Sequence, residues 1–123
     1  MDNNFTPTVY TLVDKNGKNY EAHIYPGAPL YINVLEPIGF TYYEVGLSVC
    51  EKNKESKARL LIFYIYENYR NLDIESALLD RTEMNLLDLG YSSLFGVVKE
   101  EDFPFFANKG YRGGPREIFK DLG

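Results

Sequence analysis

The chain has 123 residues, of which 45% are hydrophobic and 25% are charged, and its formal net charge is −5. A chain of this size and composition buries enough apolar surface to fold without disulfides, so general disorder is excluded. The acidity argues against general nucleic-acid binding, and the single cysteine, Cys50, excludes both an intrachain disulfide and a multi-cysteine metal site.

The chain is expected to form one compact domain over residues 1–123, with residues 1–7 as a flexible lead-in. Its N-terminus lacks the basic and apolar segments of a signal peptide. No apolar stretch approaches the roughly 20 residues of a membrane helix. We therefore expect a cytoplasmic location and no membrane partner.

Residues 8–14 and 18–25 are predicted to form a β-hairpin. Asn16 and Gly17 accommodate the positive φ angles of its tight turn. In the second strand, Glu21 and His23 share the more polar face and are expected to form an exposed polar pair.

Further strands are predicted at residues 30–35 and 40–50. The second of these alternates apolar with small or polar residues, as expected for a sheet with one protected side. The polar residues 51–55 then form a loop.

The central stretch, residues 56–71, is predicted to organise the fold. Leu60–Tyr66 is an unbroken apolar and aromatic run, which must be core. Ser56 as N-cap and apolar residues at helical spacing favour a helix. The alternative is a strand that returns from residues 41–49, because the run is rich in β-branched and aromatic side chains.

A second helix is predicted at residues 73–88, with Asp73 as its cap and Gly90 as its stop. A strand at residues 91–99 follows, and Pro115 begins a short C-terminal helix. The expected fold class is α+β. An antiparallel sheet of about four or five strands is packed on one face by one or two helices, residues 56–71 and 73–88.

The segment 109–116, KGYRGGPR, is the strongest candidate for a binding site. Its glycines let backbone amides approach a ligand, and its cations attract phosphate or carboxylate. The alternative is a flexible connection whose charges serve solubility, because the spacing matches no known phosphate-binding motif. The candidate residues are Lys109, Tyr111, Arg112, Gly113, Gly114 and Arg116.

Phe105 and Phe106 belong to a second aromatic candidate, FPFF at residues 103–106. Exposed aromatics at such a position anchor a partner or stack on a base. The alternative, which we favour, is that they plug the open end of the sheet, because an exposed triplet promotes aggregation.

No catalytic residue, metal ligand set or cofactor motif is predicted. His23 is the only histidine, and no nucleophile lies near it in the sequence. A zinc site lacks its usual ligands. Cys50 is expected to be an ordinary half-buried thiol.

The function predicted from these features is a non-catalytic interaction protein of bacterial or phage origin, of the inhibitor or immunity type. Small size, acidity and an excess of tyrosine favour binding to another protein, and the sequence leaves a homodimer open. One alternative is a binding or sequestering protein for a small anionic ligand, such as a nucleotide, through residues 109–116. A third hypothesis is a small enzyme that uses His23 or a pair of carboxylates.

Overall fold

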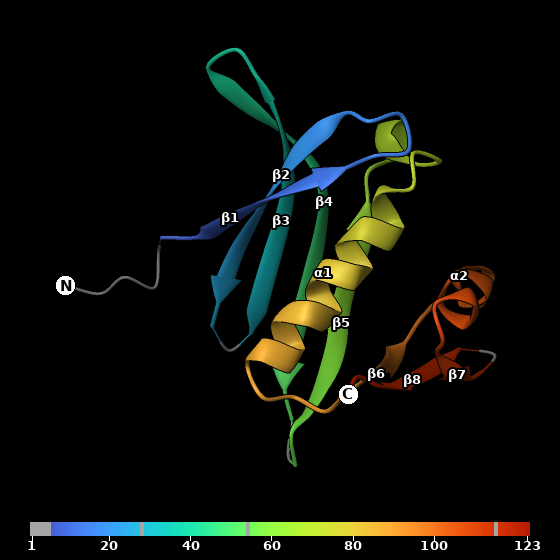
Figure 1. Cartoon of the computed structure of the whole chain (residues 1–123). Coiled ribbons are helices and arrows are strands. Elements are labelled where there is room, and N and C mark those ends of the chain that lie inside the picture. Colours follow the sequence, from blue (N-terminus) through green and yellow to red (C-terminus); the bar gives the residue numbers. More distant parts are fainter. Residues whose placement is uncertain (1–5, 28, 54, 115) are drawn as a thin grey trace.

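A single mixed β-sheet dominates the computed structural model, which describes residues 6–27, 29–53, 55–114 and 116–123 (Figure 1). Eight strands lie in the order β1-β2-β3-β4-β5-β6-β8-β7. The predicted antiparallel sheet of about four or five strands is therefore wrong, because β5 and β6 run parallel and the C-terminal segment adds further strands. The strands are β1 Thr8–Val13, β2 Asn19–Pro26, β3 Leu30–Ile38, β4 Thr41–Lys52, β5 Lys57–Ile65, β6 Ser93–Val97, β7 Arg112–Gly113 and β8 Glu117–Asp121.

The first five strands form an antiparallel meander. The predicted first hairpin is confirmed: Asp14 N–H donates to the Lys18 carbonyl at 2.9 Å, and Gly17 has φ 85°. Strand β3 continues through Pro37 beyond its predicted end, and the β3–β4 hairpin projects past the rest of the sheet (Figure 1). Phe40, at the tip of this hairpin, is fully exposed.

The predicted helix at residues 56–71 is wrong, because this stretch is strand β5 followed by the 3₁₀ turn η1, Glu67–Tyr69. Ile62 and Phe63 pair with Val49 and Ser48 of β4, so the strand alternative was the correct one. Branched and aromatic side chains fit a pleated surface, and tertiary pairing outweighs the helical spacing of the run. Leu60 and Ile65 point to the core.

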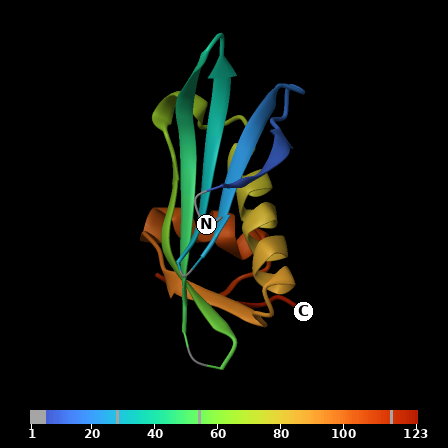
Figure 2. The same ribbon diagram turned by 90° about the vertical axis from the view of Figure 1, so that its left-hand side faces the viewer.

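Helix α1, Ile74–Asp88, confirms the predicted second helix and covers one face of the sheet (Figure 2). Its apolar side packs on strands β1, β4 and β5. Ser48 of β4 also meets this helix, because the Thr82 hydroxyl donates to Ser48 Oγ at 3.0 Å. The buried residues of the helix are Ile74, Leu78, Leu79, Thr82 and Leu86.

The C-terminal segment completes the sheet. After β6 the chain forms the 3₁₀ turn η2, Glu100–Asp102, and the short helix α2, Phe103–Asn108. The predicted C-terminal helix is wrong, because β8 pairs antiparallel with β6 from Val97↔Glu117 to Ser93↔Asp121. Over so short a stretch, the apolar residues Ile118 and Phe119 are compatible with a strand as well as with a helix.

Some predictions fall outside the described residues: most of the lead-in, residues 1–5, and the proposed helix start, Pro115. Within the part of the chain that the structure describes, none of the helices is both long enough and apolar enough to span a bilayer.

Candidate functional site

The parallel strands β5 and β6 separate midway along β5, near the end of β6, and a cleft opens between them. Their pairing runs from Lys57↔Ser93 to Leu60↔Gly96. Beyond that point β5 continues beside β4, whereas β6 turns away with β8. A cavity of about 380 Å³ lies where they separate. Sheets with parallel strands bind ligands at the carboxyl ends of strands that diverge, which makes this cleft the candidate site.

Gly96 lets the two strands approach closely just before they separate. A Cβ atom at this position would lie 3.1 Å from the carbonyl oxygen of Leu60 and 3.2 Å from its Cβ. Such distances are tighter than ordinary van der Waals contact, so a side chain here would push the strands apart. Gly96 therefore sets the base of the cleft.

Aromatic rings form the floor of the cleft. The Phe63 ring stacks on Phe105 with centroids 6.0 Å apart and meets Phe106 edge-on at 5.6 Å. Phe106 is only 2% exposed, so α2 seals the floor against the core. The apolar and aromatic lining consists of Leu60, Leu61, Phe63, Tyr64, Ile65, Val97, Val98, Phe105 and Phe106.

Charged side chains surround the mouth of the cleft. Arg70 comes from the loop between β5 and α1 and Glu75 from the first turn of α1, whereas Lys99, Glu101 and Asp102 come from the chain that follows β6. Arg70 is engaged on both sides: its Nε donates to the Ile65 carbonyl at 2.9 Å, and its guanidinium lies 5.2 Å from the Tyr64 ring centroid. Carboxylates therefore outnumber cations around the opening.

The loop between β5 and α1 forms one lip of the cleft and is held by distant contacts. Lys15 N–H donates to the Leu72 carbonyl at 2.9 Å, and the Tyr69 hydroxyl donates to Glu36 Oε1 at 2.6 Å. Burial, and then the hydrogen bond to Glu36, raise the pKa of Tyr69 to about 12. The phenol therefore stays a proton donor at neutral pH.

Left-handed backbone conformations shape the last turn of this loop. Asn71 has φ 67° and Asp73 has φ 65°, a region that Asn and Asp tolerate better than most residues. Asp73 occupies the N-cap position of α1, but its side chain makes no capping hydrogen bond, so the predicted capping role is wrong. The left-handed backbone replaces the extended conformation that a capping residue adopts.

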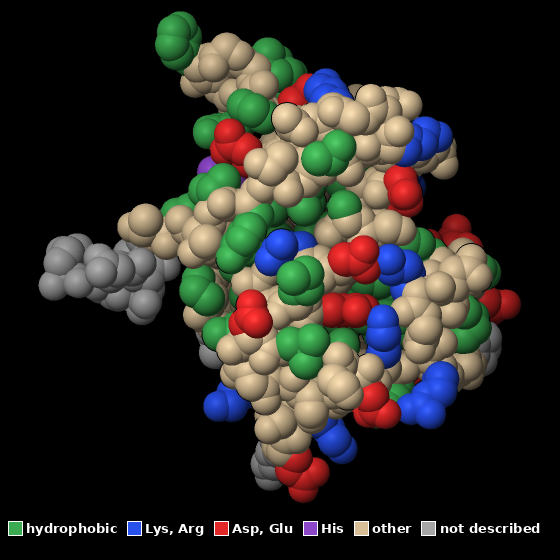
Figure 3. Space-filling view, in the orientation of Figure 1, with side chains coloured by type: hydrophobic (Ala, Val, Ile, Leu, Met, Phe, Trp, Pro, Cys, Tyr) green, Lys and Arg blue, Asp and Glu red, His purple; other side chains and the backbone are tan. Residues whose placement is uncertain are grey.

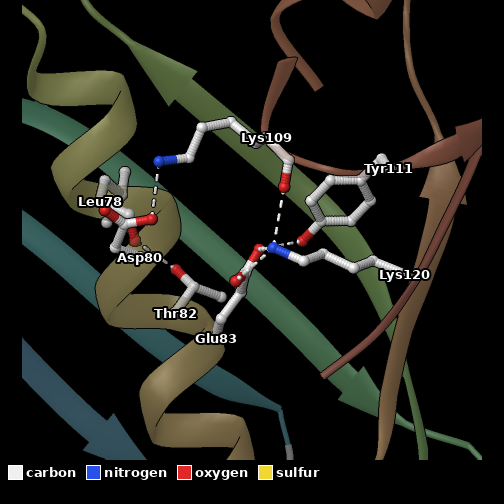
Figure 4. A network of polar contacts seen from close by, with 7 residues as sticks. All are labelled: Leu78, Asp80, Thr82, Glu83, Lys109, Tyr111 and Lys120. Carbon is white, nitrogen blue, oxygen red and sulfur yellow. Dashed lines mark hydrogen bonds and ion pairs between the residues drawn. The ribbon is translucent and has the colours of Figure 1, made fainter. Parts of the chain in front are cut away.

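The predicted binding segment lies away from this cleft for most of its length. Tyr111 is 4% exposed, and its hydroxyl donates to Glu83 Oε2 at 2.7 Å (Figure 4). Lys109 Nζ lies 2.8 Å from Asp80 Oδ1, and Arg112 lies 3.5 Å from Asp121. Lys109 and Tyr111 thus lie together against α1.

The other candidates of this segment have separate positions. Gly113 lies in β7, where a Cβ would collide with the backbone carbonyl of Glu117, and a Cβ on Gly114 would meet the Phe103 ring at 3.0 Å. Arg116 is exposed beside a shallower hollow lined by Val97, Val98, Lys99 and Glu100. A role of these residues in ligand or partner binding stays a prediction.

Lys120 completes the polar cluster that joins the C-terminal strands to α1. Its Nζ donates to Glu83 Oε1 at 3.0 Å and to the Lys109 carbonyl at 2.8 Å (Figure 4). Acidic and basic side chains interleave on this face of the molecule (Figure 3). We refer to Asp80, Glu83, Lys109, Tyr111 and Lys120 as the polar clamp.

The other sequence candidates also have partners. Phe105 and Phe106, the favoured plug, pack into the cleft floor as described above. His23 Nε2 lies 2.8 Å from Glu21 Oε1, so the expected polar pair forms, although the His23 side chain is only 14% exposed. Cys50 is buried, and burial raises its pKa to about 12.

Sequence reasoning did not identify the cleft or its charged mouth. Arg70 and Glu75 were assigned to helices, and Lys99 to the end of a strand. The signal that would have located the site is the order strand, helix, parallel strand at β5, α1 and β6, because such units bind ligands where their strands end. This signal depends on recognising residues 57–65 as a strand.

No family model matches the chain, and no curated protein matches its sequence. Solved structures do share its fold. A GNAT-family acetyltransferase from Staphylococcus aureus Mu50 matches with a TM-score of 0.67 at 17% identity, over 77% of this chain and 68% of that chain. N-Acetylglutamate synthase from Neisseria gonorrhoeae, complexed with coenzyme A and N-acetyl-glutamate, matches with a TM-score of 0.64 at 13% identity, over 76% of this chain and 26% of the synthase.

At these identities the comparison establishes the fold, which is that of the GNAT acetyltransferases. The predicted non-catalytic interaction protein of the inhibitor or immunity type is therefore wrong, and so is the alternative of a nucleotide-sequestering protein. The first was inferred from small size, acidity, an excess of tyrosine and the absence of a catalytic motif, and the second from the glycines and cations of residues 109–116. A site formed by the separation of two strands leaves no such motif in the sequence.

Proposed function

We propose that this chain transfers an acyl group from a thioester donor to an amine, with the cleft between β5 and β6 as its donor site. The observation that carries the proposal is the separation of these parallel strands beyond Leu60 and Gly96 over an aromatic floor. The fold shared with GNAT acetyltransferases supports this class of reaction.

Coenzyme A, which the gonococcal synthase binds, is the donor carrier that this fold suggests. Its pantetheine arm suits the cleft. Residues 63–65 of β5 pair with β4 on one edge and line the cavity, where strand amides can bond to the amides of the arm. Phe63, Phe105 and Phe106 offer apolar surface to an acyl group.

The phosphates of coenzyme A do not suit the mouth of the cleft. The first amides of α1 have no side-chain cap and would favour an anion. However, Asp73 and Glu75 place carboxylates at the same helix start, and Glu101 and Asp102 line the opposite lip. Like charges in such proximity repel. We therefore assign no step to the nucleotide part of this carrier.

The acidic mouth suits the other substrate, the amine. Glu75, Glu101 and Asp102 attract an alkylammonium ion from solution. The bound ammonium ion first loses a proton to solvent, and the neutral amine then attacks the thioester carbonyl, so that the new C–N bond forms and the C–S bond breaks. A carboxylate at the mouth accepts the proton that the nitrogen loses, and the departing thiolate is protonated in turn.

Turnover with defined substrates tests this proposal. The full chain is incubated with acetyl-coenzyme A or S-acetyl-pantetheine and with a panel of polyamines, amino sugars and lysine peptides, and mass spectrometry follows the N-acetyl product. We expect product from at least one combination. Absence of product above the uncatalysed rate in every combination would overturn the proposal.

A cleft-filling variant localises the reaction. Val97 lines the cavity and is 68% exposed, so Val97→Trp adds bulk to the cleft without entering the core. We expect at least a tenfold loss of kcat/KM, because donor binding loses space. The control is Val13→Trp on β1, where the side chain is 49% exposed, and it should retain activity.

A further inference from the structure

The carboxylates at the cleft mouth disfavour a thioester that carries phosphate groups. Glu75 lies in the first turn of α1 and lines the cleft, and Asp73 immediately precedes the helix. A phosphate placed against the α1 amides would meet these carboxylates at close range. The favourable helix dipole is therefore opposed by fixed negative charge.

The cations near the mouth are poorly placed to offset this charge. Arg70 is bound to the Ile65 carbonyl and lies against the Tyr64 ring. Lys99 is exposed on the opposite lip, close to Glu100 and Arg116 around the shallower hollow. A phosphate drawn to Lys99 would still have Glu101 and Asp102 beside it.

The apolar part of the cleft has no such conflict. Phe63 and Phe105 stack at 6.0 Å, and with Leu60 they form a surface that binds an uncharged arm or an acyl chain. Binding free energy from this surface depends on buried apolar area and not on ionic strength. The floor of the cleft therefore favours an apolar acyl group and an uncharged arm, whereas the mouth disfavours phosphates.

We propose that the donor is recognised through its acyl group and pantetheine-like arm, and that nucleotide phosphates add nothing to its affinity. The substrate class is a small uncharged acyl thioester. An acyl-coenzyme A should bind no more tightly than the same acyl group on pantetheine alone. This inference rests on the proposed function, because it concerns the same donor site.

Titration calorimetry on the full chain compares acetyl-coenzyme A, S-acetyl-pantetheine and adenosine 3′,5′-bisphosphate. We expect dissociation constants for the two thioesters within about threefold of each other and no heat from the bisphosphate, because the phosphates make no net favourable contact. Acetyl-coenzyme A binding more than about tenfold tighter than S-acetyl-pantetheine would overturn the inference and leave the proposed function standing. Binding of neither thioester would overturn both.

A charge-neutralising variant tests the cause. Asp73→Asn keeps a residue that tolerates φ 65°, and Glu75→Gln keeps the shape of its side chain. Together they should tighten acetyl-coenzyme A binding about tenfold and leave S-acetyl-pantetheine unchanged. Asp88→Asn, an exposed residue at the other end of α1, removes a charge remote from the cleft and should change neither. Equal tightening by the control would overturn the inference.

Discussion

The Tyr69 hydroxyl donates a 2.6 Å hydrogen bond to Glu36 Oε1, and this contact fastens the lip of the cleft to strand β3. The same carboxylate forms an ion pair with Lys18 of the first hairpin. The Tyr69 ring also meets Tyr20 edge-on, with centroids 6.2 Å apart. The loop at the lip of the cleft is thus positioned by Glu36, Lys18 and Tyr20, which do not line the cleft themselves.

Tyr69→Phe removes this hydrogen bond and keeps the ring. We expect the free energy of unfolding to fall by about 1.5–3 kcal/mol, because the acceptor is charged and Glu36 is largely buried. Urea denaturation measures the change. Tyr66→Phe is the control: it removes a 2.8 Å hydrogen bond to Glu44 at an exposed site and should cost clearly less than Tyr69→Phe. Equal losses would contradict the anchoring role of Tyr69.

Acid should weaken the same region. Hydrogen bonds from Lys18 and then Tyr69 lower the pKa of Glu36. Burial raises the pKa of Asp14, but hydrogen bonds from Tyr20 and from two backbone N–H groups outweigh it and lower that pKa. A lowered pKa stabilises the fold above the unfolded value, and this stabilisation disappears as the pH falls through the folded value.

The unfolded values are 3.8 for Asp14 and 4.5 for Glu36, so both contributions are complete near pH 6. We expect the free energy of unfolding to decline below about pH 4.5 and the decline to be shallower in Glu36→Gln. Urea denaturation at a series of pH values measures both slopes. Identical slopes in the variant and the parent would contradict the contribution of Glu36.

The polar clamp gives a third prediction. Glu83 accepts hydrogen bonds from Tyr111 at 2.7 Å and from Lys120 at 3.0 Å, and its side chain is 14% exposed. Glu83→Gln should lower the free energy of unfolding by about 1–3 kcal/mol, because Lys120 loses its charged partner. Hydrogen exchange should also speed up in β8. Asp80→Asn removes a 58% exposed partner of Lys109 and should cost less than about 1 kcal/mol.

Local sequence patterns correctly predicted the first hairpin and helix α1. The first hairpin follows from Asn16-Gly17 between alternating strands, and α1 follows from a long segment of good helix formers that ends at Gly90. Residues 57–65 were assigned wrongly because an unbroken apolar run fits a buried strand and a buried helix equally well. The possible return from residues 41–49 pointed to a strand, but the parallel partner β6 is distant in sequence and adds no local signal.

The site was less predictable than the fold. The cleft exists because β5 and β6 stop pairing beyond Leu60 and Gly96, which is a relation between two backbones and not a pattern of side chains. The segment 109–116 was predicted to bind an anion because the sequence shows no carboxylate partners for its cations. In the structure Lys109 and Arg112 contact Asp80 and Asp121, carboxylates that sequence spacing does not bring near them.

Cys50 gives a fourth prediction. Its side chain is 2% exposed, and burial raises its pKa to about 12 against a weaker opposing hydrogen bond with Ser48. The thiolate is the reactive form, so the native protein should not react with a disulfide reagent at pH 8 over minutes. The same protein in concentrated urea should react at once. Rapid labelling of the folded chain would contradict the burial of this thiol.

Gly96→Ala tests the base of the cleft directly. The new Cβ would lie 3.1 Å from the Leu60 carbonyl oxygen, so β5 and β6 must separate and the free energy of unfolding should fall by about 1–3 kcal/mol. Donor affinity should fall as well, because the cleft floor shifts. Gly27→Ala is the control: its Cβ would meet only ordinary contact at 3.4 Å from the Pro29 carbonyl oxygen. Denaturation and calorimetry measure both effects, and wild-type behaviour of Gly96→Ala would refute this role for Gly96.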